Sequence, residues 1–374
     1  MRILILAPGP TIHGGVPKVT SHLVSALGGL GCDVTLHSWG RHRDGEGIAW
    51  KIVQRLADIR SIRSILRHER FDVLLVETAH DWATLSRDIP LLLATRALVR
   101  RSVLHFHGSF CDRLVAPGHM PFKMASALML KLTDAAFVLS SEEQRQWQEF
   151  YPRGRFYLVC NAFLPLAPVD PESARRRLAL PAELPIVLFA GRLIEAKGVS
   201  ELVDMLPRVL ARMPVHLLVV GEGPLEVELR QRAARLGVGN RLTIAGYIED
   251  EPFQAAFHCA DIFALPTAWA EGFPLAIAEA MGAGLPIVTT RFRGMADHLC
   301  QGVNTLFVPL RDPAALADAV IRLLGDPQMR TRMGHANREK VREFTPDRVG
   351  RHHLEILREV LDGQTRDTKR PRVG

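Results

Sequence analysis

Residues 261–290 read DIFALPTAWAEGFPLAIAEAMGAGLPIVTT, and this stretch contains the structural unit that recurs along the chain. The apolar run at 261–266 is typical of a strand, and a run of helix-forming residues follows Pro274. The residues PIVTT (286–290) then predict a second strand. A strand–helix–strand unit of this kind predicts a parallel sheet with helices on both faces.

The same alternation extends in both directions from this stretch. Before residue 161 the strand-like runs are RILILA (2–7), CDVTLH (32–37), DVLLVE (72–77), SVLHFH (102–107), AAFVLS (135–140) and RFYLVC (155–160). After residue 185 they are IVLFAG (186–191), HLLVVG (216–221), RLTIAG (241–246), DIFALP (261–266), PIVTT (286–290) and NTLFVP (304–309). Segments with helical spacing separate them, so we expect two doubly wound α/β domains in tandem.

A proline-rich segment, NAFLPLAPVDPESA (161–174), has no periodicity and is interpreted as the interdomain linker. The predicted parts are an N-terminal domain at 1–165, a C-terminal domain at 175–345, a helix at 346–362 that returns to the first domain, and a disordered basic tail at 363–374. Ligands of such sheets bind outside the carboxyl ends of the strands, so two facing domains would form one cleft.

Composition limits the class of protein. The chain has 374 residues, of which 47% are hydrophobic, enough for two large cores. No uncharged apolar run approaches the roughly 18 residues that a membrane span needs, and the start MRILILAPGP is interpreted as a strand rather than a secretory signal. Five cysteines are scattered singly without a C-x-x-C motif, which favours a reducing cytoplasm.

Charge is distributed unevenly along the chain. Residues 1–160 hold 20 Lys and Arg against 14 Asp and Glu, whereas residues 161–362 hold 23 against 25. A basic first half and a slightly acidic second half favour two surfaces with different partners, although a solvated basic face would give the same numbers. Nucleic acid is not the expected partner, because the basic residues are not interleaved with aromatic ones.

Glycine and proline mark several junctions between a strand and a helix. The dinucleotide fingerprint G-x-G-x-x-G and the phosphate-binding P-loop are absent from the sequence. Instead, Pro17, Pro224 and Pro274 each stand where a helix is expected to begin, and no Ser, Thr, Asp or Asn precedes them as a cap. The first amides of these helices would then be free to bind either an anion or water.

Charged residues accompany these junctions. In GRLIEAKG (191–198), Arg192 follows a strand and Lys197 precedes the next helix, a pair that suits a diphosphate but could also be two solvated cations. Glu271 lies just before the helix that starts at Pro274, and Glu279 lies near its second turn.

These motifs carry a family resemblance. In order and spacing, GRLIEAKG, GEGPLEVEL and EGFPLAIAEAMGAGLPIV resemble the retaining glycosyltransferases of family 4, which have the GT-B fold. The paired glutamates are similar to that family's E-x7-E motif, and GGVPKVTSHLVSAL, HFHG and TDAAFVLSSEE match the first half. The resemblance implies two Rossmann-like domains facing across a cleft, with C-terminal helices that pack back on the N-terminal domain. It also implies that residues 1–165 bind the acceptor and residues 175–345 bind the sugar nucleotide.

The resemblance also implies roles for individual residues. The catalytic set would be His107, Glu271, Arg192 and Lys197, and the donor-binding set would be Gly14, Gly15, Gly272, Phe273, Pro274, Leu275, Glu279 and Tyr247. The amides of the uncapped helix would meet the donor's diphosphate, and Glu279 would accept from both ribose hydroxyls. Arg192 and Lys197 would neutralise the phosphates. Three residues depart from the family pattern: Arg293 and Thr305 stand where the family often has glycine, and Asp297 where it often has glutamate. The Asp297 side chain is shorter by one methylene, so the resemblance does not imply the usual contacts at that position.

His107 could be a metal ligand, a structural histidine or a contact of the donor sugar. His105 and His107 are two apart on a strand and therefore point the same way, as zinc ligands could. No third ligand is evident nearby, so we expect no metal, and the absence of Asp-x-Asp agrees with a metal-independent site. The family resemblance implies that His107 contacts the donor sugar near the reacting carbon, with His105 structural.

The expected function is transfer of a hexose, with retention, from a nucleotide-diphosphate sugar to a glycan or a lipid-linked glycan acceptor, as in polysaccharide biosynthesis. No cofactor is expected beyond this donor, and UDP-sugars are favoured over GDP-sugars. A GT-B UDP-N-acetylhexosamine epimerase and a non-catalytic sugar-nucleotide-binding subunit stay open as alternatives.

The acceptor side is expected in the basic first half. PLLLATRALVRR (90–101) and PFKMASALMLKL (121–132) look amphipathic, and each fits either a core helix or a patch on an anionic membrane. The expected location is therefore the cytoplasm, with peripheral attachment to the inner face of the membrane. The sequence does not indicate an oligomeric state.

Overall fold

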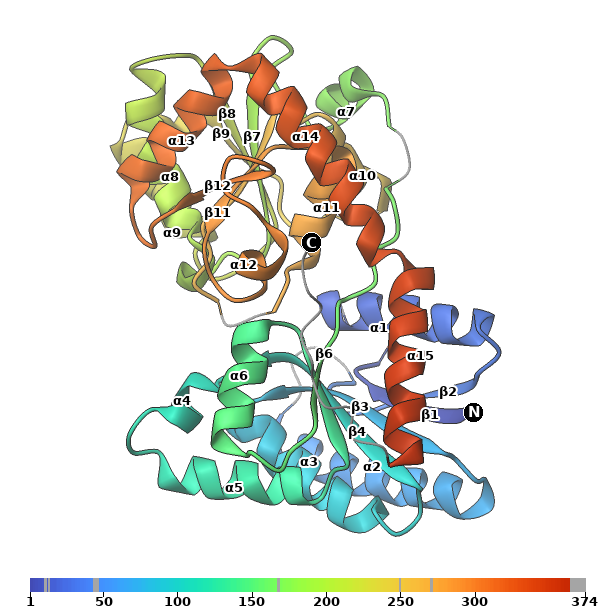
Figure 1. Ribbon diagram of the computed structural model, residues 1–374. Helices are drawn as coiled ribbons and strands as arrows, with labels where there is room; N and C mark the ends of the chain where they lie inside the picture. The colour runs from blue at the N-terminus through green and yellow to red at the C-terminus, as the bar shows by residue number, and fades with distance from the viewer. Residues whose placement is uncertain are drawn as a thin grey trace. The chain divides into compact units, whose positions relative to one another are not determined.

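The structure is a computed structural model, and it consists of two compact units. The described residues are 1–9, 12, 14–42, 47–166, 169–248, 250–269 and 272–363. Unit 1 comprises residues 1–162 and 346–374, and unit 2 comprises residues 163–345. All twelve predicted strands are found in the described part of the chain, six in each of two parallel sheets (Figure 1), which confirms the predicted fold class.

Unit 1 is built on a sheet in the order β2-β1-β3-β4-β5-β6, with every neighbouring pair parallel. Its strands are β1 (Arg2–Ala7), β2 (Asp33–Ser38), β3 (Val73–His80), β4 (Arg101–Ser109), β5 (Ala135–Val138) and β6 (Phe156–Leu158). Its helices are α1 (Gly15–Gly29), α2 (Ile48–His68), α3 (Trp82–Thr95), α4 (Asp112–Val115), α5 (Met120–Lys131), α6 (Ser141–Phe150) and α15 (Pro346–Asp362).

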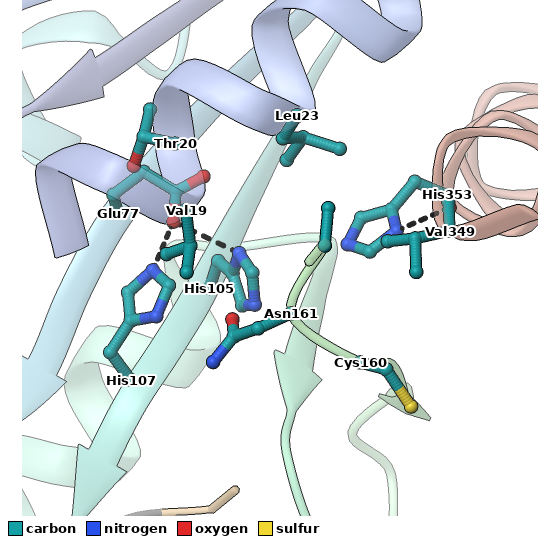
Figure 2. A pocket seen from close by; sticks show the side chains of 11 residues that line it. Val19, Thr20, Leu23, Glu77, His105, His107, Cys160, Asn161, Val349 and His353 are labelled. Carbon is teal, nitrogen blue, oxygen red and sulfur yellow. Dashed lines mark hydrogen bonds and ion pairs between the residues drawn. The ribbon is translucent and has the colours of Figure 1, made fainter. Parts of the chain in front are cut away.

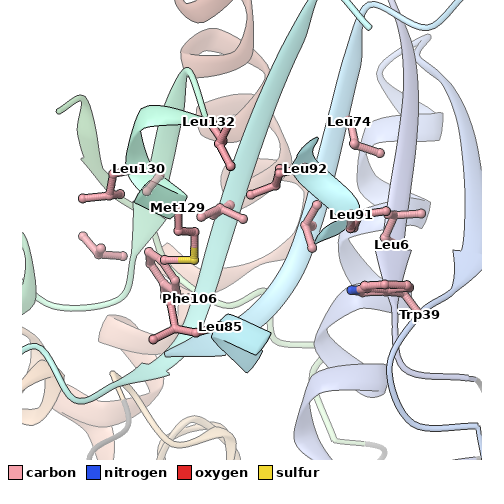
Figure 3. Packing of buried hydrophobic residues seen from close by; sticks show 14 of the residues in the cluster. Leu6, Trp39, Leu74, Leu85, Leu91, Leu92, Phe106, Met129, Leu130 and Leu132 are labelled. Carbon is pink, nitrogen blue, oxygen red and sulfur yellow. The ribbon is translucent and has the colours of Figure 1, made fainter. Parts of the chain in front are cut away.

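Successive side chains of the unit 1 strands enter two different hydrophobic layers, as the pleat of a strand requires. Leu6, Leu74 and Phe106 belong to the layer shown in Figure 3, to which α2, α3 and α5 contribute. Leu75 and the other strand residues whose side chains point to the opposite face of the sheet belong to a second layer, to which α1 and α15 contribute. Both faces of the sheet are therefore buried, which explains why its central strands are mostly apolar.

Helix α15 returns to unit 1 after the chain has passed through unit 2, as predicted for the C-terminal helix. It lies beside α1 (Figure 1), and a methyl group added at Gly350 would be 2.8 Å from the side chain of Ala26, so glycine permits this close approach. The Tyr157 hydroxyl donates to Glu359 Oε1 at 3.0 Å, and Arg101 Nε donates to the Val360 carbonyl at 3.1 Å. Packing and polar contacts together fix the helix on the sheet.

Unit 2 repeats the doubly wound design with the strand order β12-β11-β10-β7-β8-β9. Its strands are β7 (Ile186–Ala190), β8 (His216–Val220), β9 (Leu242–Ile244), β10 (Ile262–Leu265), β11 (Ile287–Thr290) and β12 (Thr305–Val308). Its α-helices are α7 (Pro171–Arg177), α8 (Val199–Leu210), α9 (Glu226–Arg235), α10 (Asp250–His258), α11 (Leu275–Ala283), α12 (Gly294–His298), α13 (Pro313–Gly325) and α14 (Pro327–Val341). Short 3-10 helices are η1 (Glu195–Lys197), η2 (Gly239–Arg241) and η3 (Arg342–Phe344).

The predicted linker, cysteines, membrane spans and tail can be compared with the structure. The segment expected to be a linker contains the division between the units, after Ala162, and also the first turn of α7, which Asp170 caps by accepting from the Ser173 amide at 2.8 Å. All five cysteines are free thiols. None of the helices in the described residues is both long enough and apolar enough to cross a bilayer. The tail from residue 364 lies outside the described residues.

A buried histidine in unit 1 predicts sensitivity to acid. His80 packs against Phe106, Phe122 and Trp147, and its Nε2 lies 2.8 Å from Ser126 Oγ. Burial, with the charge of Arg113 adding to it, lowers the pKa of His80 from 6.5 to about 3. As the pH falls below 6.5, the unfolded chain binds a proton that the folded chain does not bind until about pH 3, so folding stability is lost.

We therefore expect the acid sensitivity to fall when His80 is replaced. At pH 5 the imidazole should reduce the free energy of unfolding by about 2 kcal/mol relative to neutral pH. Urea or thermal unfolding of the wild type and of His80→Leu at pH 7.5 and pH 5 measures this, and the variant should lose less stability on acidification. Equal losses in the two proteins would show that His80 is not the group responsible.

Candidate functional site

The carboxyl edge of the unit 2 sheet is where a ligand of this fold is expected. The loops after β7 and β8 are joined there by backbone hydrogen bonds, because the Leu193 amide donates to the Glu222 carbonyl at 2.9 Å and the Leu225 amide to the Leu193 carbonyl at 3.2 Å. A Cβ at Gly221 would lie 2.0 Å from the Gly191 oxygen, and one at Gly223 would lie 2.5 Å from the Leu193 oxygen. The glycines of GEGP thus serve the contact between loops.

The contact between these two loops changes the interpretation of the glycine–proline junction at Pro224. Helix α9 begins at Glu226, two residues after Pro224, and carries the acids Glu226 and Glu228 in its first turn. Acidic side chains already complement the positive end of that helix, so the prediction of an anion site there loses its basis. The glycines at that junction are explained by packing rather than by a ligand.

The prolines do not stand at the first helical position, which corrects the sequence-based prediction. Pro274 is the residue before α11 and has an extended backbone (φ −61°, ψ 134°), while Pro17 is the third residue of α1. Proline is tolerated at both places because the amides of a first turn have no partner within the helix. As predicted, no side chain of the described residues caps α1 or α11.

The Gly14–Gly15 pair differs from the other glycines. A Cβ at either position would have no heavy atom within 4 Å among the described residues, so packing does not require glycine there. Gly14 has φ +148°, which favours glycine, and it precedes α1 without supplying a cap. The start of α1 in unit 1 therefore has both free amides and open space.

Two predicted cations lie close to the loop that follows β10. The Ala268 amide and the Thr267 hydroxyl both donate to the Ala196 carbonyl, at 2.7 and 3.2 Å, which ties that loop to η1 beside Lys197. Lys197 is only 7% exposed, whereas Arg192 is exposed and lies with its guanidinium carbon 5.0 Å from the centre of the Trp269 ring. The structure thus brings Arg192, Lys197 and this loop together.

The segment leading into α11 is only partly described. Glu271 lies outside the described residues, and Gly272 is buried just before the helix. The Phe273 ring is buried against His298 and Phe344, with ring centres 4.8 and 5.2 Å away, so only its backbone is available to a ligand. Glu279 is 2% exposed in the second turn of α11, which begins at Leu275. Tyr247 is 45% exposed after β9.

The turn before α12 explains one departure from the family pattern. Arg293 has φ +48°, a region that favours glycine, and it is 4% exposed. The backbone therefore keeps a conformation suited to the glycine that the family often has, although the side chain is arginine. The arginine therefore places a guanidinium in the interior of unit 2, whereas a glycine would place none there.

Unit 1 contains a buried polar cluster that the sequence analysis found only in part. Figure 2 shows Glu77 on β3 facing His105 and His107 on β4. His105 Nδ1 lies 2.9 Å from Glu77 Oε2, and His107 Nε2 contacts the same oxygen. The side chains are 3%, 7% and 0% exposed for His105, His107 and Glu77, respectively. The prediction that no third group accompanies the two histidines was therefore wrong.

Electrostatics in this cluster follow from burial and proximity. Burial opposes ionisation of Glu77, but the imidazoles of His105 and His107 outweigh it and hold the pKa of this carboxyl below its usual range. Burial and the neighbouring His105 lower the pKa of His107, although Glu77 opposes that shift. We interpret the group as a carboxylate that accepts hydrogen bonds from its neighbours.

The same three residues have the ligand chemistry of a metal site, with their candidate ligand atoms all within 4.8 Å of one another. However, Nε2 of His107 is hydrogen-bonded to Glu77 Oε2, as an N–H donor would be, and Nδ1 of His105 lies near the same oxygen. A metal ion needs a lone pair directed at it from each ligand, so this arrangement fits a hydrogen-bonded cluster better. Glu77 could have been suspected from sequence because it follows the apolar run VLLV in the strand-like stretch DVLLVE (72–77).

Two family models match the two halves of the chain. "Glycosyltransferase Family 4" matches residues 13–163, and "Glycosyl transferases group 1" matches residues 184–326. Each match contains the junctions and cations described above for its half.

Individual relatives agree with these matches. The lipopolysaccharide core biosynthesis glycosyltransferase LpsE of Rhizobium meliloti is 32% identical over 186 residues, 49% of this chain and 52% of that protein. The D-inositol 3-phosphate glycosyltransferase of Xylanimonas cellulosilytica is 29% identical over 311 residues, 78% of this chain and 67% of that protein. For the first of these, the match spans about half of the relative's length.

A solved structure gives the same fold. Anabaena Alr3699/HepE, in complex with UDP and glucose, has a TM-score of 0.75 at 18% identity and covers 96% of this chain and 100% of its own. At this identity the likeness concerns the fold alone. Together with the two family models and the named relatives, it identifies the chain as a GT-B protein of the family 4 glycosyltransferases.

Proposed function

We propose that the protein transfers a hexose from a nucleotide-diphosphate sugar to a glycan or lipid-linked glycan acceptor, with retention and without a metal ion. The observation that carries this proposal is the arrangement in unit 2, where Arg192 and Lys197 flank a loop that leads into the uncapped helix α11. Two cations and free helical amides suit a diphosphate, since fixed donors stabilise its charge without reorganisation.

The donor would be held by contacts of different kinds. Glu279 accepts from the two ribose hydroxyls, and Tyr247 lies against the base. The backbone of Gly272, Phe273, Pro274 and Leu275 meets the diphosphate, and Gly14 and Gly15 let the start of α1 approach the donor. UDP is favoured as the nucleotide, in keeping with the fold relative that binds UDP and glucose.

In the proposed reaction, the bond between the anomeric carbon and the diphosphate oxygen breaks while the acceptor oxygen bonds to the same face. The acceptor's proton passes to the leaving phosphate, so the products are the glycoside and the nucleoside diphosphate. Arg192 and Lys197 stabilise the charge that develops on the leaving group. Glu271 binds sugar hydroxyls rather than acting as a nucleophile, and His107 contacts the transferred sugar.

A surface on unit 1 supports an acceptor at a membrane. On α5, Met120, Met124 and Leu128 are 61%, 68% and 42% exposed at intervals of four residues, which places them on one face. The opposite face of α5 is buried, so the helix both packs in the core and exposes an apolar stripe. Trp82 and Leu93 of the neighbouring α3 are 52% and 55% exposed. A relative that is named as a lipopolysaccharide core biosynthesis glycosyltransferase agrees with such an acceptor.

The cations expected to assist membrane binding are not equivalent. Lys123 Nζ donates to the Ala116 carbonyl at 2.6 Å, and Arg100 pairs with Asp72 at 3.0 Å. Arg96 and Lys131 are exposed and have no ion-pair partner among the described residues. We propose peripheral attachment to the inner face of the cytoplasmic membrane through the apolar stripe, assisted by Arg96 and Lys131.

Transfer itself is tested by incubating the purified protein with UDP-, GDP- and ADP-sugars, with and without glycan or lipid-linked acceptors. We expect release of nucleoside diphosphate to depend on the acceptor, the product to keep the anomeric configuration, and EDTA to leave the rate unchanged. Interconversion of sugars without an acceptor would favour an epimerase. Donor binding without turnover would favour a non-catalytic subunit, and restoration by zinc or magnesium after EDTA would contradict the metal-free mechanism.

Replacement of Glu279 should weaken donor binding. Each hydrogen bond from a ribose hydroxyl to a carboxylate contributes about 1.5–3 kcal/mol, so Glu279→Ala should raise the dissociation constant of UDP at least about tenfold. Calorimetry measures the constant, and Glu279→Gln separates the loss of charge from the loss of shape. Asp318→Ala, which removes an exposed unit 2 carboxylate paired with Arg208, serves as the control. Unchanged UDP binding in Glu279→Ala would exclude this residue from the site.

Membrane attachment is tested by flotation with vesicles. The wild type should bind phosphatidylglycerol vesicles more strongly than phosphatidylcholine vesicles, and less at high salt, because screening acts over about 8 Å at physiological ionic strength. Met124→Ser with Leu128→Ser, and separately Arg96→Glu with Lys131→Glu, should each reduce binding while UDP binding is retained. The control Val227→Ser changes an apolar residue of unit 2 that is 66% exposed. Absence of vesicle binding at low salt would favour a soluble acceptor.

A further inference from the structure

Glu77 is a buried acid near the carboxyl edge of the unit 1 sheet, with a side chain that is 0% exposed, and no lysine or arginine pairs with it in the described residues. Its surroundings come from four elements: His105 and His107 from β4, Thr20 from α1, Asn161 from the segment after β6, and His353 from α15. Burying a carboxylate is unfavourable unless hydrogen-bonding groups surround it. Its position therefore requires an explanation beyond packing.

The strand register brings the three polar residues of the cluster together. Glu77 is the direct partner of His105 in the parallel pairing of β3 and β4, and His107 lies two residues further on the same face. The His105 and His107 ring centres are 4.3 Å apart, and His105 also touches Phe137 and His353. His105 is thus enclosed, while His107 occupies the end of the cluster near the carboxyl edge.

The two nitrogens of His107 have different surroundings. Nε2 contacts Glu77 Oε2, whereas Nδ1 has no hydrogen-bond partner in the described part of the chain. Unlike both nitrogens of His105, Nδ1 of His107 is not among the unpaired atoms that are sealed from solvent. A carboxylate that accepts from one imidazole nitrogen keeps the proton on that nitrogen, so the other nitrogen presents a lone pair.

We propose that Glu77 is a positioning residue for His107. It holds the ring in one orientation, with the proton on Nε2, so that Nδ1 can accept a hydrogen bond from a hydroxyl of the transferred sugar. This inference rests on the proposed function, which supplies the sugar that His107 contacts. Where a carboxylate orients a metal-ligating histidine, its removal changes activity by about 10- to 100-fold, and we expect an effect of similar size for Glu77.

A small cavity next to the cluster explains how the second oxygen of Glu77 is accommodated. The cavity has a volume of about 10 Å³ and is lined in part by Thr20, Glu77, Asn161 and His353, each with a buried polar atom that no described group pairs with (Figure 2). This volume and lining suit one buried water molecule. Such a water would connect α1 and α15 to the carboxylate and hold it against His107.

The tautomer of His107 can be measured without turnover. In protein labelled with 15N-histidine, long-range 1H–15N spectra report which ring nitrogen carries the proton, and His107→Gln and His105→Gln assign the signals. We expect Nε2 of His107 to be protonated in the wild type and the preference to disappear in Glu77→Leu. Glu77→Gln keeps the shape and one acceptor oxygen, so it should retain part of the preference.

Kinetics provide the second readout. Both Glu77 variants should lower kcat by about tenfold or more, with a smaller change in KM for the donor. Asp88→Asn is the matched control, because Asp88 is a fully buried carboxylate on the other layer of unit 1 that accepts from Trp39 at 2.9 Å. This control should leave the His107 tautomer unchanged and keep kcat within about twofold of the wild type.

Three results would overturn the proposal. The first is a proton on Nδ1 of His107 in the wild type. The second is that Glu77→Leu leaves the tautomer or kcat unchanged. The third is that the purified protein contains one equivalent of a divalent metal whose removal alters the His107 signals. In the last case Glu77 would be a metal ligand. If the proposed function fails, the wild type itself transfers no sugar, whereas failure of this inference leaves transfer intact in the Glu77 variants.

Discussion

Parallel pairing of strands is the constraint from which the rest of this structure follows. A parallel neighbour can be reached only by a crossover, so each strand is followed by a helix that covers one face of the sheet. All strands of a sheet then end at the same edge, and the loops that leave this edge are neighbours in space. In unit 2 this brings residues after β7, β8 and β10 together although they are far apart in sequence.

The proximity of these loops leaves little room for side chains. The backbone at Gly221 and Gly223 approaches the carbonyls of Gly191 and Leu193 so closely that any Cβ would collide with them. Glycines in this position hold Arg192 on a defined loop rather than contact a ligand themselves. The Gly14–Gly15 pair in unit 1 has open space instead, which makes it the better candidate for approach to a substrate. The glycines at the two junctions thus have different explanations: close packing between loops for Gly221 and Gly223, and open space for a substrate for Gly14 and Gly15.

In unit 1 the same constraint creates the buried polar cluster. The register of β3 and β4 pairs Glu77 with His105, and the two-residue repeat of the strand adds His107 to the same face. Helices α1 and α15 cover this face with apolar side chains, which keeps water from competing for the hydrogen bonds. The C-terminal helix, contributed by a distant part of the chain, therefore helps to define the surroundings of a residue on β4.

The sequence by itself determined the twelve strands and the two doubly wound sheets, because apolar periodicity and glycine–proline junctions are local properties of the chain. The family resemblance implied the return of the last helix, which depends on contacts with distant residues. The sequence also identified Arg192 and Lys197, each adjacent to a strand end or a helix start. Only the tertiary structure decided which glycines serve packing, that Lys123 is engaged by Ala116, and that Glu77 accompanies the two histidines. Each of these facts depends on which distant group lies opposite a residue. Strand register and loop contacts decide which group that is, and local spacing in the sequence does not.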